Sequence, residues 1–399
     1  MRRYFSIATV LAGVAIVCGV RAQARESKPT TGSDRPLWEI DLRQFGYERW
    51  LRRSTRPLPL FVDFTDVDHL AVGWIRPDIP HVDGRRAPLG PEPAHLNVVI
   101  LDAKTGQKQS KTEWPTSARY FSAPLFFGIP DGRLLICSDN VLRLLSPTLE
   151  VVREQELPNH ASCVNVAFQH SPSRRTLLVT ILSEHSRQME LLGVETLAIL
   201  SSWTEERAAS ATFMGILSIS DHWLAGYCGE PTELCLRRFD KGWQPFHPNG
   251  FDTQMDKRQR IPVSFVSDEI LVVERKTTGI VTVDGTVLFR IAPPEKHFLL
   301  LPATSAGGAR FALIEDRFRG LRSEPLDMYP FQANDRALVY GIKDRRNVFS
   351  LKLKGTSPWT PWDVHDNYLA LSPNGTHLAV LSDGVLKIYP LPSDSAEQH

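Results

Sequence analysis

The chain has 399 residues, of which 42% are hydrophobic and 23% charged, with 46 basic and 45 acidic side chains. These are ordinary globular values, so the composition excludes a disordered or collagen-like chain. Twenty-nine prolines and 25 glycines are spread along the sequence, which indicates many turns. The near-zero net charge gives no reason to expect nucleic acid as a partner.

The first 24 residues predict a signal peptide. A basic start at Met1–Arg3 precedes an apolar run over residues 7–20, and Ala22–Ala24 places small residues where a signal peptidase requires them. We expect cleavage after Ala24, and an uncleaved membrane anchor is the alternative. Residues 1–24 contain three arginines and no acid, so the mature chain has 43 basic and 45 acidic side chains.

The leader predicts an exported protein, periplasmic or extracellular. The paired arginines leave both the general and the twin-arginine export pathway open. No later stretch approaches the roughly 20 apolar residues of a membrane-spanning helix. We therefore expect no membrane span in the mature chain.

Residues 25–36 are predicted to be a flexible lead-in to a first strand, Leu37–Leu42, in which apolar and acidic residues alternate. The next segment, Gln44–Pro57, mixes four arginines with aromatic residues, a composition that also occurs at anionic surfaces. Since the mature chain has no basic excess, we interpret this segment as a connector or a short helix.

From Leu60 onwards a pattern recurs in which apolar strands of about five to seven residues alternate with turns. We count seven groups of four strands; six groups with one irregular stretch is the competing count. The second strand of a group is the least polar, as in TLLVTIL at 176–182, which indicates burial on both faces. The seven groups begin at Leu60, Pro124, Cys163, Thr212, Val263, His297 and Trp362.

The last group holds only three strands, within Tyr368–Pro392. Ser372–Gly375 forms a tight turn after the first of them, because Pro presets φ and Asn-Gly supplies positive φ. We expect Leu37–Leu42 to pair as the missing fourth strand and so close a ring. The predicted fold is all-β: a single β-propeller domain over residues 37–392, with seven four-stranded antiparallel blades closed by the N- and C-terminal strands.

Two stretches resemble known propeller blades. Leu371–Tyr389 (LSPNGTHLAVLSDGVLKIY) resembles a blade of WD-repeat and TolB-like propellers, with Asn374 in place of the usual aspartate. Val99–Trp114 (VILDAKTGQKQSKTEW) is similar to a blade of pyrroloquinoline-quinone (PQQ) propellers and their non-enzymatic relatives. Each resemblance covers one blade and concerns turn chemistry, so it implies the fold and leaves the activity open.

Two long insertions interrupt the strands, at residues 76–95 in the first blade and 315–335 in the sixth. Long loops on a rigid ring commonly carry binding sites. Surface loops also accept extra length at small entropic cost, so both interpretations stay open. Residues 393–399 are expected to form a tail.

Four cysteines remain after the leader, and export permits disulfides. Cys228 and Cys235 flank a turn between two strands, so we predict a disulfide across this hairpin. Cys137 and Cys163 lie in apolar strands, and we expect both to be buried free thiols.

The sequence has no recognisable catalytic set: it lacks a G-x-S-x-G elbow, an H-E-x-x-H motif, a glycine-rich phosphate loop and a C-x-x-C pair. Asp63, Asp66 and Asp68 with His69 offer ligands for Ca²⁺ but lack the glycine and distal glutamate of a calcium loop. Backbone hydrogen bonding at a turn explains these residues more simply. We assign no catalytic, cofactor-binding or metal-binding residue.

These observations favour an exported, monomeric, non-catalytic propeller that binds a protein, peptide or glycan through loops on one face. The alternative is a propeller enzyme, such as a hydrolase, a lyase or a quinoprotein-like oxidoreductase, with its site at the central channel. Separated loops can assemble such a site without leaving a linear motif.

Overall fold

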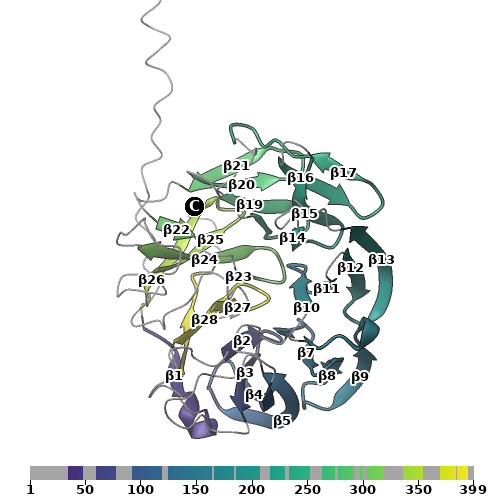
Figure 1. The fold of residues 1–399 in the computed structure, drawn as a ribbon. Coiled ribbons are helices and arrows are strands. Elements are labelled where there is room, and N and C mark those ends of the chain that lie inside the picture. Colours follow the sequence, from purple (N-terminus) through teal and green to yellow (C-terminus); the bar gives the residue numbers. More distant parts are fainter. Residues whose placement is uncertain are drawn as a thin grey trace, which may run out of the picture.

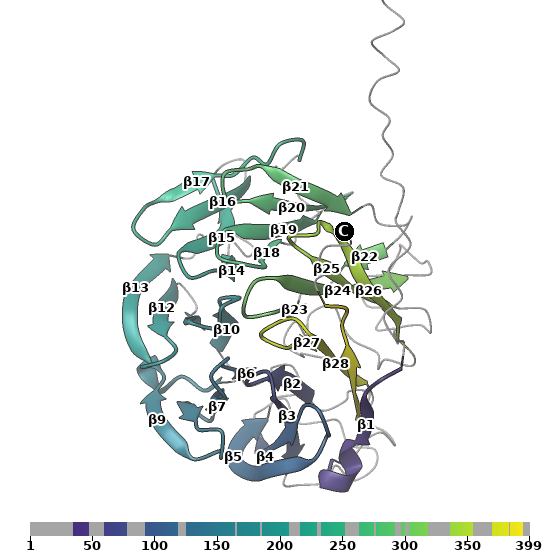
Figure 2. The ribbon, with the colours of Figure 1, turned by 180° about the vertical axis from the view of Figure 1, so that it is seen from behind.

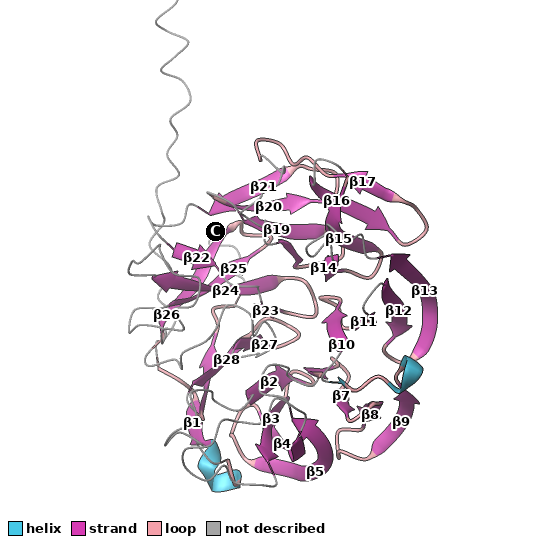
Figure 3. Cartoon of the chain, in the orientation of Figure 1, coloured by secondary structure: helices cyan, strands magenta, loops and turns pink. Residues whose placement is uncertain are grey.

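The strands pair into seven antiparallel sheets arranged in a ring, as a computed structural model shows (Figures 1 and 2). The two helical segments among the described residues are the short 3-10 turns η2 (Leu42–Phe45) and η3 (Pro158–His160) (Figure 3). The predicted leader lies outside the described residues. The structure describes residues 35–47, 60–77, 92–118, 125–163, 166–183, 186–206, 216–229, 233–251, 263–274, 277–291, 297–299, 303–317, 336–353, 369–382 and 384–393.

The first four blades follow one another along the chain, each a meander whose strands are paired in sequence order. Blade 1 consists of β2 (Leu60–Phe64), β3 (His69–Pro77), β4 (Glu92–Asp102) and β5 (Lys108–Ala118). Blade 2 consists of β6 (Phe126–Gly128), β7 (Leu134–Ser138), β8 (Val141–Leu145) and β9 (Val151–Glu156). Blade 3 consists of β10 (Val166–His170), β11 (Thr176–Leu182), β12 (Ser186–Gly193) and β13 (Ala198–Glu206). Blade 4 consists of β14 (Ile216–Ile219), β15 (Trp223–Cys228), β16 (Glu233–Arg238) and β17 (Trp243–Pro245).

The remaining three blades include one irregular blade and the closing one. Blade 5 consists of β18 (Val263–Phe265), β19 (Ile270–Glu274), β20 (Thr278–Thr282) and β21 (Val287–Ile291). Blade 6 consists of β22 (His297–Leu299), β23 (Ala303–Thr304), β24 (Arg310–Arg317), β25 (Arg336–Gly341) and β26 (Arg346–Lys352), and both β22 and β23 pair with β24. Blade 7 consists of β27 (Leu369–Leu371), β28 (His377–Ser382), β29 (Val385–Pro390) and β1 (Trp38–Asp41).

The chain closes its ring by pairing its ends, as the sequence predicted. β1 lies antiparallel to β29, with Trp38 opposite Ile388 and Asp41 opposite Val385. The indole nitrogen of Trp38 also donates a hydrogen bond of 2.8 Å to the Ala103 carbonyl of blade 1. The closing strand therefore contacts both β29 in its own blade and the neighbouring blade 1. Seven blades are therefore confirmed, and the competing count of six is wrong.

The hydrophobic core is divided among the seven interfaces between neighbouring blades. Each of the seven clusters of buried apolar side chains joins two adjacent blades. In β28, for example, Leu378 and Val380 pack toward blade 6, whereas Ala379 and Leu381 pack toward blade 1. Side chains alternate between the faces of a strand, so a strand between two interfaces must be apolar at every position.

The innermost strands approach each other so closely that one position requires glycine. A Cβ added to Gly128 would lie 2.0 Å from the Phe64 carbonyl oxygen of the neighbouring blade. No side chain fits at that distance. Gly128 therefore sets how near blades 1 and 2 can come to each other at the inner edge.

The hairpins between the third and fourth strands of a blade repeat one backbone shape. A residue with positive φ stands just before the fourth strand in five blades, followed by a register shift between the two strands. Glycine fills this position in two blades and other residue types in three. The five residues are Gly106, Leu149, Leu197, Gly285 and Arg345.

Candidate functional site

The meander gives the ring two different faces. In an antiparallel four-stranded blade, the connections between strands one and two and between strands three and four emerge on one side. The connection between strands two and three and the crossing to the next blade emerge on the other. We call these the turn face and the loop face.

The two faces differ in the lengths of their connections. On the turn face every connection within a blade has three to five residues. On the loop face, residues 78–91 join β3 to β4 and residues 318–335 join β24 to β25. The strand ends that flank both predicted insertions therefore lie on the loop face, but β3 and β4 extend into the first predicted range (76–95) and β24 extends into the second (315–335). The remainder of each insertion lies outside the described residues.

Hydrogen bonds between neighbouring blades hold the turn face together. Ser173 of blade 3 donates to Asp221 of blade 4 at 2.7 Å, and Ser220 of blade 4 donates to Asp268 of blade 5 at 2.8 Å. The Gly307 amide of blade 6 donates to the Pro373 carbonyl of blade 7 at 3.0 Å. Short side chains and backbone groups at equivalent turns thus link one blade to the next.

Asp268 also holds a histidine on this face. The carboxylate lies 2.6 Å from Nδ1 of His222. Burial alone would raise the pKa of Asp268, but the hydrogen bonds from His222 and Ser220 outweigh burial and lower it. The imidazole is largely exposed, so this pair joins blades 4 and 5 at the surface.

A buried ion pair on the turn face joins two blades that are not adjacent. Arg174, in the first turn of blade 3, forms a bidentate pair with Asp63 at the end of β2 in blade 1. The guanidinium also donates to the Gly128 carbonyl of blade 2 at 3.2 Å, and the Gly128 amide donates to Asp63 at 3.0 Å. The side chains are 7% and 1% exposed, so the pair joins three blades out of contact with water.

His170, beside this pair, is held in its neutral form. Burial, followed by the positive charge of Arg174, lowers the pKa of His170 to about 4. Its ring lies 4.7 Å from the ring of Phe127, centroid to centroid, and Nδ1 lies 3.0 Å from the Ser171 carbonyl. A neutral imidazole packed in this way contributes contact area without adding a second buried cation.

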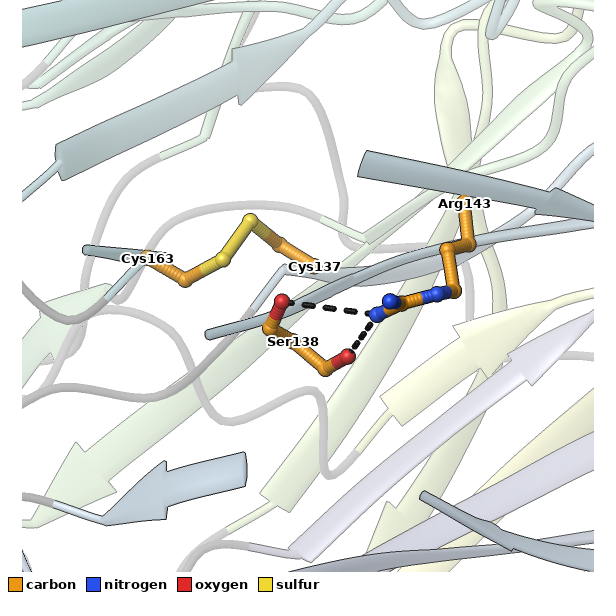
Figure 4. Close-up of a disulfide and its surroundings, with 4 residues drawn as sticks. All are labelled: Cys137, Ser138, Arg143 and Cys163. Atoms are coloured by element: carbon orange, nitrogen blue, oxygen red, sulfur yellow. Dashed lines mark hydrogen bonds between the residues drawn. A yellow bond between two sulfur atoms is a disulfide. The ribbon is translucent and has the colours of Figure 1, made fainter. Parts of the chain in front are cut away.

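Disulfides reinforce the loop face. Cys228 at the end of β15 is bonded to Cys235 in β16, across the hairpin between the second and third strands of blade 4. The structure also bonds Cys137 to Cys163 (Figure 4). The expectation of two buried free thiols at Cys137 and Cys163 is therefore wrong.

The Cys137–Cys163 disulfide ties the crossing from blade 2 to blade 3 onto the end of β7. Two backbone hydrogen bonds reinforce it, from Cys163 to the Asp139 carbonyl and from Leu157 to the Asn140 carbonyl. Arg143 lies beside it and donates to the backbone and the hydroxyl of Ser138 (Figure 4). The two sulfurs meet only when blades 2 and 3 are packed, so the strand pattern alone gives no sign of the bond.

A polar cluster marks the part of blade 1 that projects on the loop face. Glu113 of β5 accepts a hydrogen bond of 2.7 Å from Arg76 of β3, and its carboxylate lies 2.9 Å from Nδ1 of His95 in β4. All three side chains are partly exposed. Three strands therefore present a cation, an imidazole and a carboxylate next to the connection formed by residues 78–91.

A second polar group lies at the interface between blades 2 and 3, near the same face. Asn159 donates to Gln188 at 3.0 Å, and Gln188 donates to Glu190 at 3.1 Å. The Oε2 atom of Glu190 is buried without a hydrogen-bond partner, and burial raises the pKa of this carboxyl group. Asn159 and His160 both adopt positive φ. The backbone strain here accompanies a buried acid that has no cationic partner among the described residues.

The acidic residues considered as calcium ligands form hydrogen bonds and ion pairs within the protein. Asp63 is committed to Arg174, whereas Asp66 accepts hydrogen bonds from the Asp68 and His69 amides and lies 2.8 Å from Nδ1 of His69. Asp68 pairs with Lys104 at 2.7 Å. Within the described part of the chain, no three His, Cys, Asp or Glu side chains gather as metal ligands.

Arg76, His95 and Glu113 were not identified from the sequence, because two of them lie in or beside the insertion and the third in an exposed strand. The signal that could have identified them is the apolar alternation of β3 and β4, which continues into the predicted insertion. Extending both strands places Arg76, His95 and Glu113 next to one another on paired strands. In the residues that the structure describes, no helix is long and apolar enough to cross a membrane.

Comparisons with known proteins add the following. No protein-family model matches the chain, and no curated protein matches it. A functionally unknown protein from Desulfotomaculum acetoxidans DSM 771 is similar in structure, with 13% identity, a TM-score of 0.44, and coverage of 74% of this chain and 91% of that one. KlHsv2 with loop 6CD replaced by a Gly-Ser linker gives 12% identity, a TM-score of 0.45, and coverage of 82% and 90%. This level of similarity carries no argument about function, and the propeller fold is established by the chain's own strand pairing.

Proposed function

We propose that this protein is an exported, non-catalytic binding module that holds a protein, peptide or glycan on its loop face. The asymmetry between the two faces supports this proposal. Short turns joined from blade to blade form one face, and the connections at 78–91 and 318–335 belong to the other. A rigid ring that concentrates its long loops on one side is the usual arrangement of a binding scaffold.

The disulfides support two parts of the proposal: that the loop face is the binding surface, and that the protein is exported. Both of them fasten segments of the loop face, at Cys137–Cys163 and Cys228–Cys235. Fixing a surface before a ligand arrives reduces the entropy lost on binding. Disulfides also persist in oxidising compartments, which agrees with the signal peptide predicted for residues 1–24.

The cluster of Arg76, His95 and Glu113 indicates how a ligand would be recognised. Its partly exposed side chains offer a guanidinium, an imidazole and a carboxylate on paired strands, so their positions are fixed by the sheet. Rigid polar groups of this kind suit the hydroxyl, amide and carboxylate groups of glycans and peptides.

The test compares binding by the mature chain and by a variant in which residues 318–335 are replaced with a Gly-Ser segment of equal length. Both are screened against a displayed peptide library and a glycan array. We expect ligands selected by the native chain to lose at least tenfold in affinity for the variant, with an unchanged melting temperature.

A turn-face variant, Asp240→Ser with Lys241→Ser, is the matched control and should keep full affinity. Equal binding by the native chain and the loop variant, or loss of binding in the control, would contradict the assignment to the loop face. Recovery of a chemically altered ligand after incubation, measured by mass spectrometry, would support the enzyme alternative instead.

A further inference from the structure

Blade 6 carries a row of basic side chains on its two outermost strands. Arg336 of β25 and Lys352 of β26 lie directly opposite each other, and Lys343, Arg345 and Arg346 follow at the turn that joins these strands. All five side chains are exposed. We call these five residues the basic hairpin.

The basic hairpin lacks acidic partners within the described structure. None of its five side chains forms an ion pair or a side-chain hydrogen bond with a described residue. The described acids nearby are Asp344 in the same turn and the buried Glu315, which lies opposite Arg336 on β24. Some exposed cations elsewhere on the ring are paired, as Lys104 is with Asp68 and Arg238 with Asp240.

This arrangement opposes the stability of the isolated chain. Like charges directly opposite each other on antiparallel strands repel, and Arg336 and Lys352 form such a pair. The sequence as a whole has nearly equal numbers of basic and acidic side chains, so net charge does not account for the concentration of cations on this hairpin. An external anion would remove the repulsion and would pair with cations that have no acidic partner among the described residues.

The shape of the basic hairpin suits a linear ligand. β26 is the last strand of its sheet, so side chains from both of its faces border the same free edge. Arg346 and Lys352 stand six residues apart along β26, which corresponds to about 20 Å of strand. The cations are thus distributed along a line rather than gathered around a point.

The positions of the exposed apolar side chains indicate whether the basic hairpin binds a soluble polymer or a membrane surface. Proteins that rest on an anionic bilayer commonly insert apolar side chains next to their cations. The large exposed hydrophobic side chains of the described residues lie on other blades, at Leu37, Val67, Val151, Val152, Ile199 and Leu200. The basic hairpin therefore favours a soluble polyanion.

We propose that the basic hairpin of blade 6 binds an acidic polysaccharide, a linear chain that carries carboxylate or sulfate groups. Guanidinium groups match both anions geometrically, and lysine adds charge without fixed orientation. The site runs along the outer rim, from the turn face at Lys343, Arg345 and Arg346 to the loop-face ends of β25 and β26 at Arg336 and Lys352, and the proposal does not depend on the loop-face ligand. It gives the ring a second contact surface.

The test measures binding of labelled heparin and polygalacturonate oligosaccharides between 25 and 200 mM salt, by fluorescence anisotropy. Arg336→Gln, Arg346→Gln and Lys352→Gln are combined in one variant. Lys108→Gln, Arg153→Gln and Arg175→Gln are combined in a matched control, which loses the same charge from exposed positions on other blades. Melting temperatures of both variants establish that they are folded.

We expect the hairpin variant to bind at least tenfold more weakly at low salt, with a shallower dependence of affinity on salt, because fewer counterions are released. The control should change less than twofold. Equal weakening of both variants would overturn the proposal in favour of general charge attraction. So would the absence of oligosaccharide binding by the native chain, or binding to phosphatidylglycerol vesicles alone. Should the triple variant fail to fold, Lys343→Gln with Arg345→Gln, both in the exposed turn, takes its place with the same expected direction.

Discussion

Arg174 stands at a backbone position that other blades fill with glycine. The first turns of blades 2, 6 and 7 place Gly132, Gly308 and Gly375 at the equivalent positive φ, whereas Arg174 adopts φ of 65° with a full side chain. The left-handed conformation costs about 1–2 kcal/mol for such a residue. The bidentate pair with Asp63 offsets that strain, and so the residue that breaks the turn pattern is the one that joins three blades.

We predict that Arg174→Gly destabilises the ring although it restores the turn's usual residue. Removing one partner leaves the Asp63 carboxylate buried without a cation, and breaking such a pair costs about 3–5 kcal/mol. Asp63→Asn combined with Arg174→Gly should recover part of the loss. Chemical denaturation of the two single variants and the double variant measures this coupling, and strictly additive losses would contradict it.

The buried carboxyl group of Glu190 leads to a prediction about how stability depends on pH. Burial raises the pKa of its carboxyl group above the ordinary value for glutamate. The folded state therefore holds the proton more tightly than the unfolded state, and stability is lost as the pH rises through the folded pKa. Glu190→Gln removes this dependence and should raise the melting temperature at pH 7, by the equivalent of about 1 kcal/mol.

The advantage of Glu190→Gln should shrink as the pH falls below the unfolded pKa, because the native carboxyl group is then neutral in both states. Thermal melts at pH 4 and pH 7 provide the comparison. The exposed Glu195→Gln is the control. A stabilisation of equal size at both pH values would show that charge is not its cause.

At the scale of elements, the apolar alternation predicted the strands well and the connections poorly. The pattern located strands such as β11 and β28, because burial between two neighbouring blades demands apolar residues at every position. It ended β3 too early, because Pro77 and the charged Arg76 do not look like a buried strand. The Cys137–Cys163 bond was missed for a different reason, since it depends on a crossing between blades.

The repeated hairpin between third and fourth strands yields an element-scale prediction. Arg345 adopts φ of 53° at a position that Gly106 and Gly285 occupy in other blades, and its side chain is exposed. Arg345→Gly should raise the stability by about 0.5–1 kcal/mol, because the strain is relieved without loss of packing.

Leu149 and Leu197 occupy the same backbone position but are buried, at 6% and 2% exposure. Leu197→Gly should therefore destabilise the protein, because lost burial exceeds the strain relieved. Parallel thermal melts of the variants at 345 and 197 measure both signs. A destabilised Arg345→Gly protein would show that the turn shape is set by something other than positive φ.

At the scale of the whole molecule, closure of the ring was predictable and the central contacts were not. An incomplete last group and an isolated first strand are visible in the sequence, and β1 pairs with β29 as they suggested. The Asp63–Arg174 pair spans 111 positions and two interfaces, so no local pattern reveals it. The candidate site on the loop face depends on the lengths of connections, which the sequence indicated, and on Arg76, His95 and Glu113, which it did not.

We predict that deleting residues 37–42 abolishes cooperative unfolding. The deletion exposes the free edge of β29 and part of the cluster that packs against blade 1. A calorimetric or circular dichroism melt should become broad, whereas deletion of residues 25–34 should leave it unchanged. A sharp, unaltered transition in the first variant would contradict closure by β1.

The seam between β1 and β29 also sets the order in which the molecule can be completed. During synthesis, the strand that finishes the last blade emerges first and its partner emerges last, with more than 300 residues between them. Contacts so distant in sequence form slowly. The early blades can pack against one another while β1 is still unpaired. The final folding step is therefore the pairing of β1 with β29. A fully synthesised chain would present an open β29 edge to other chains until the two ends have paired.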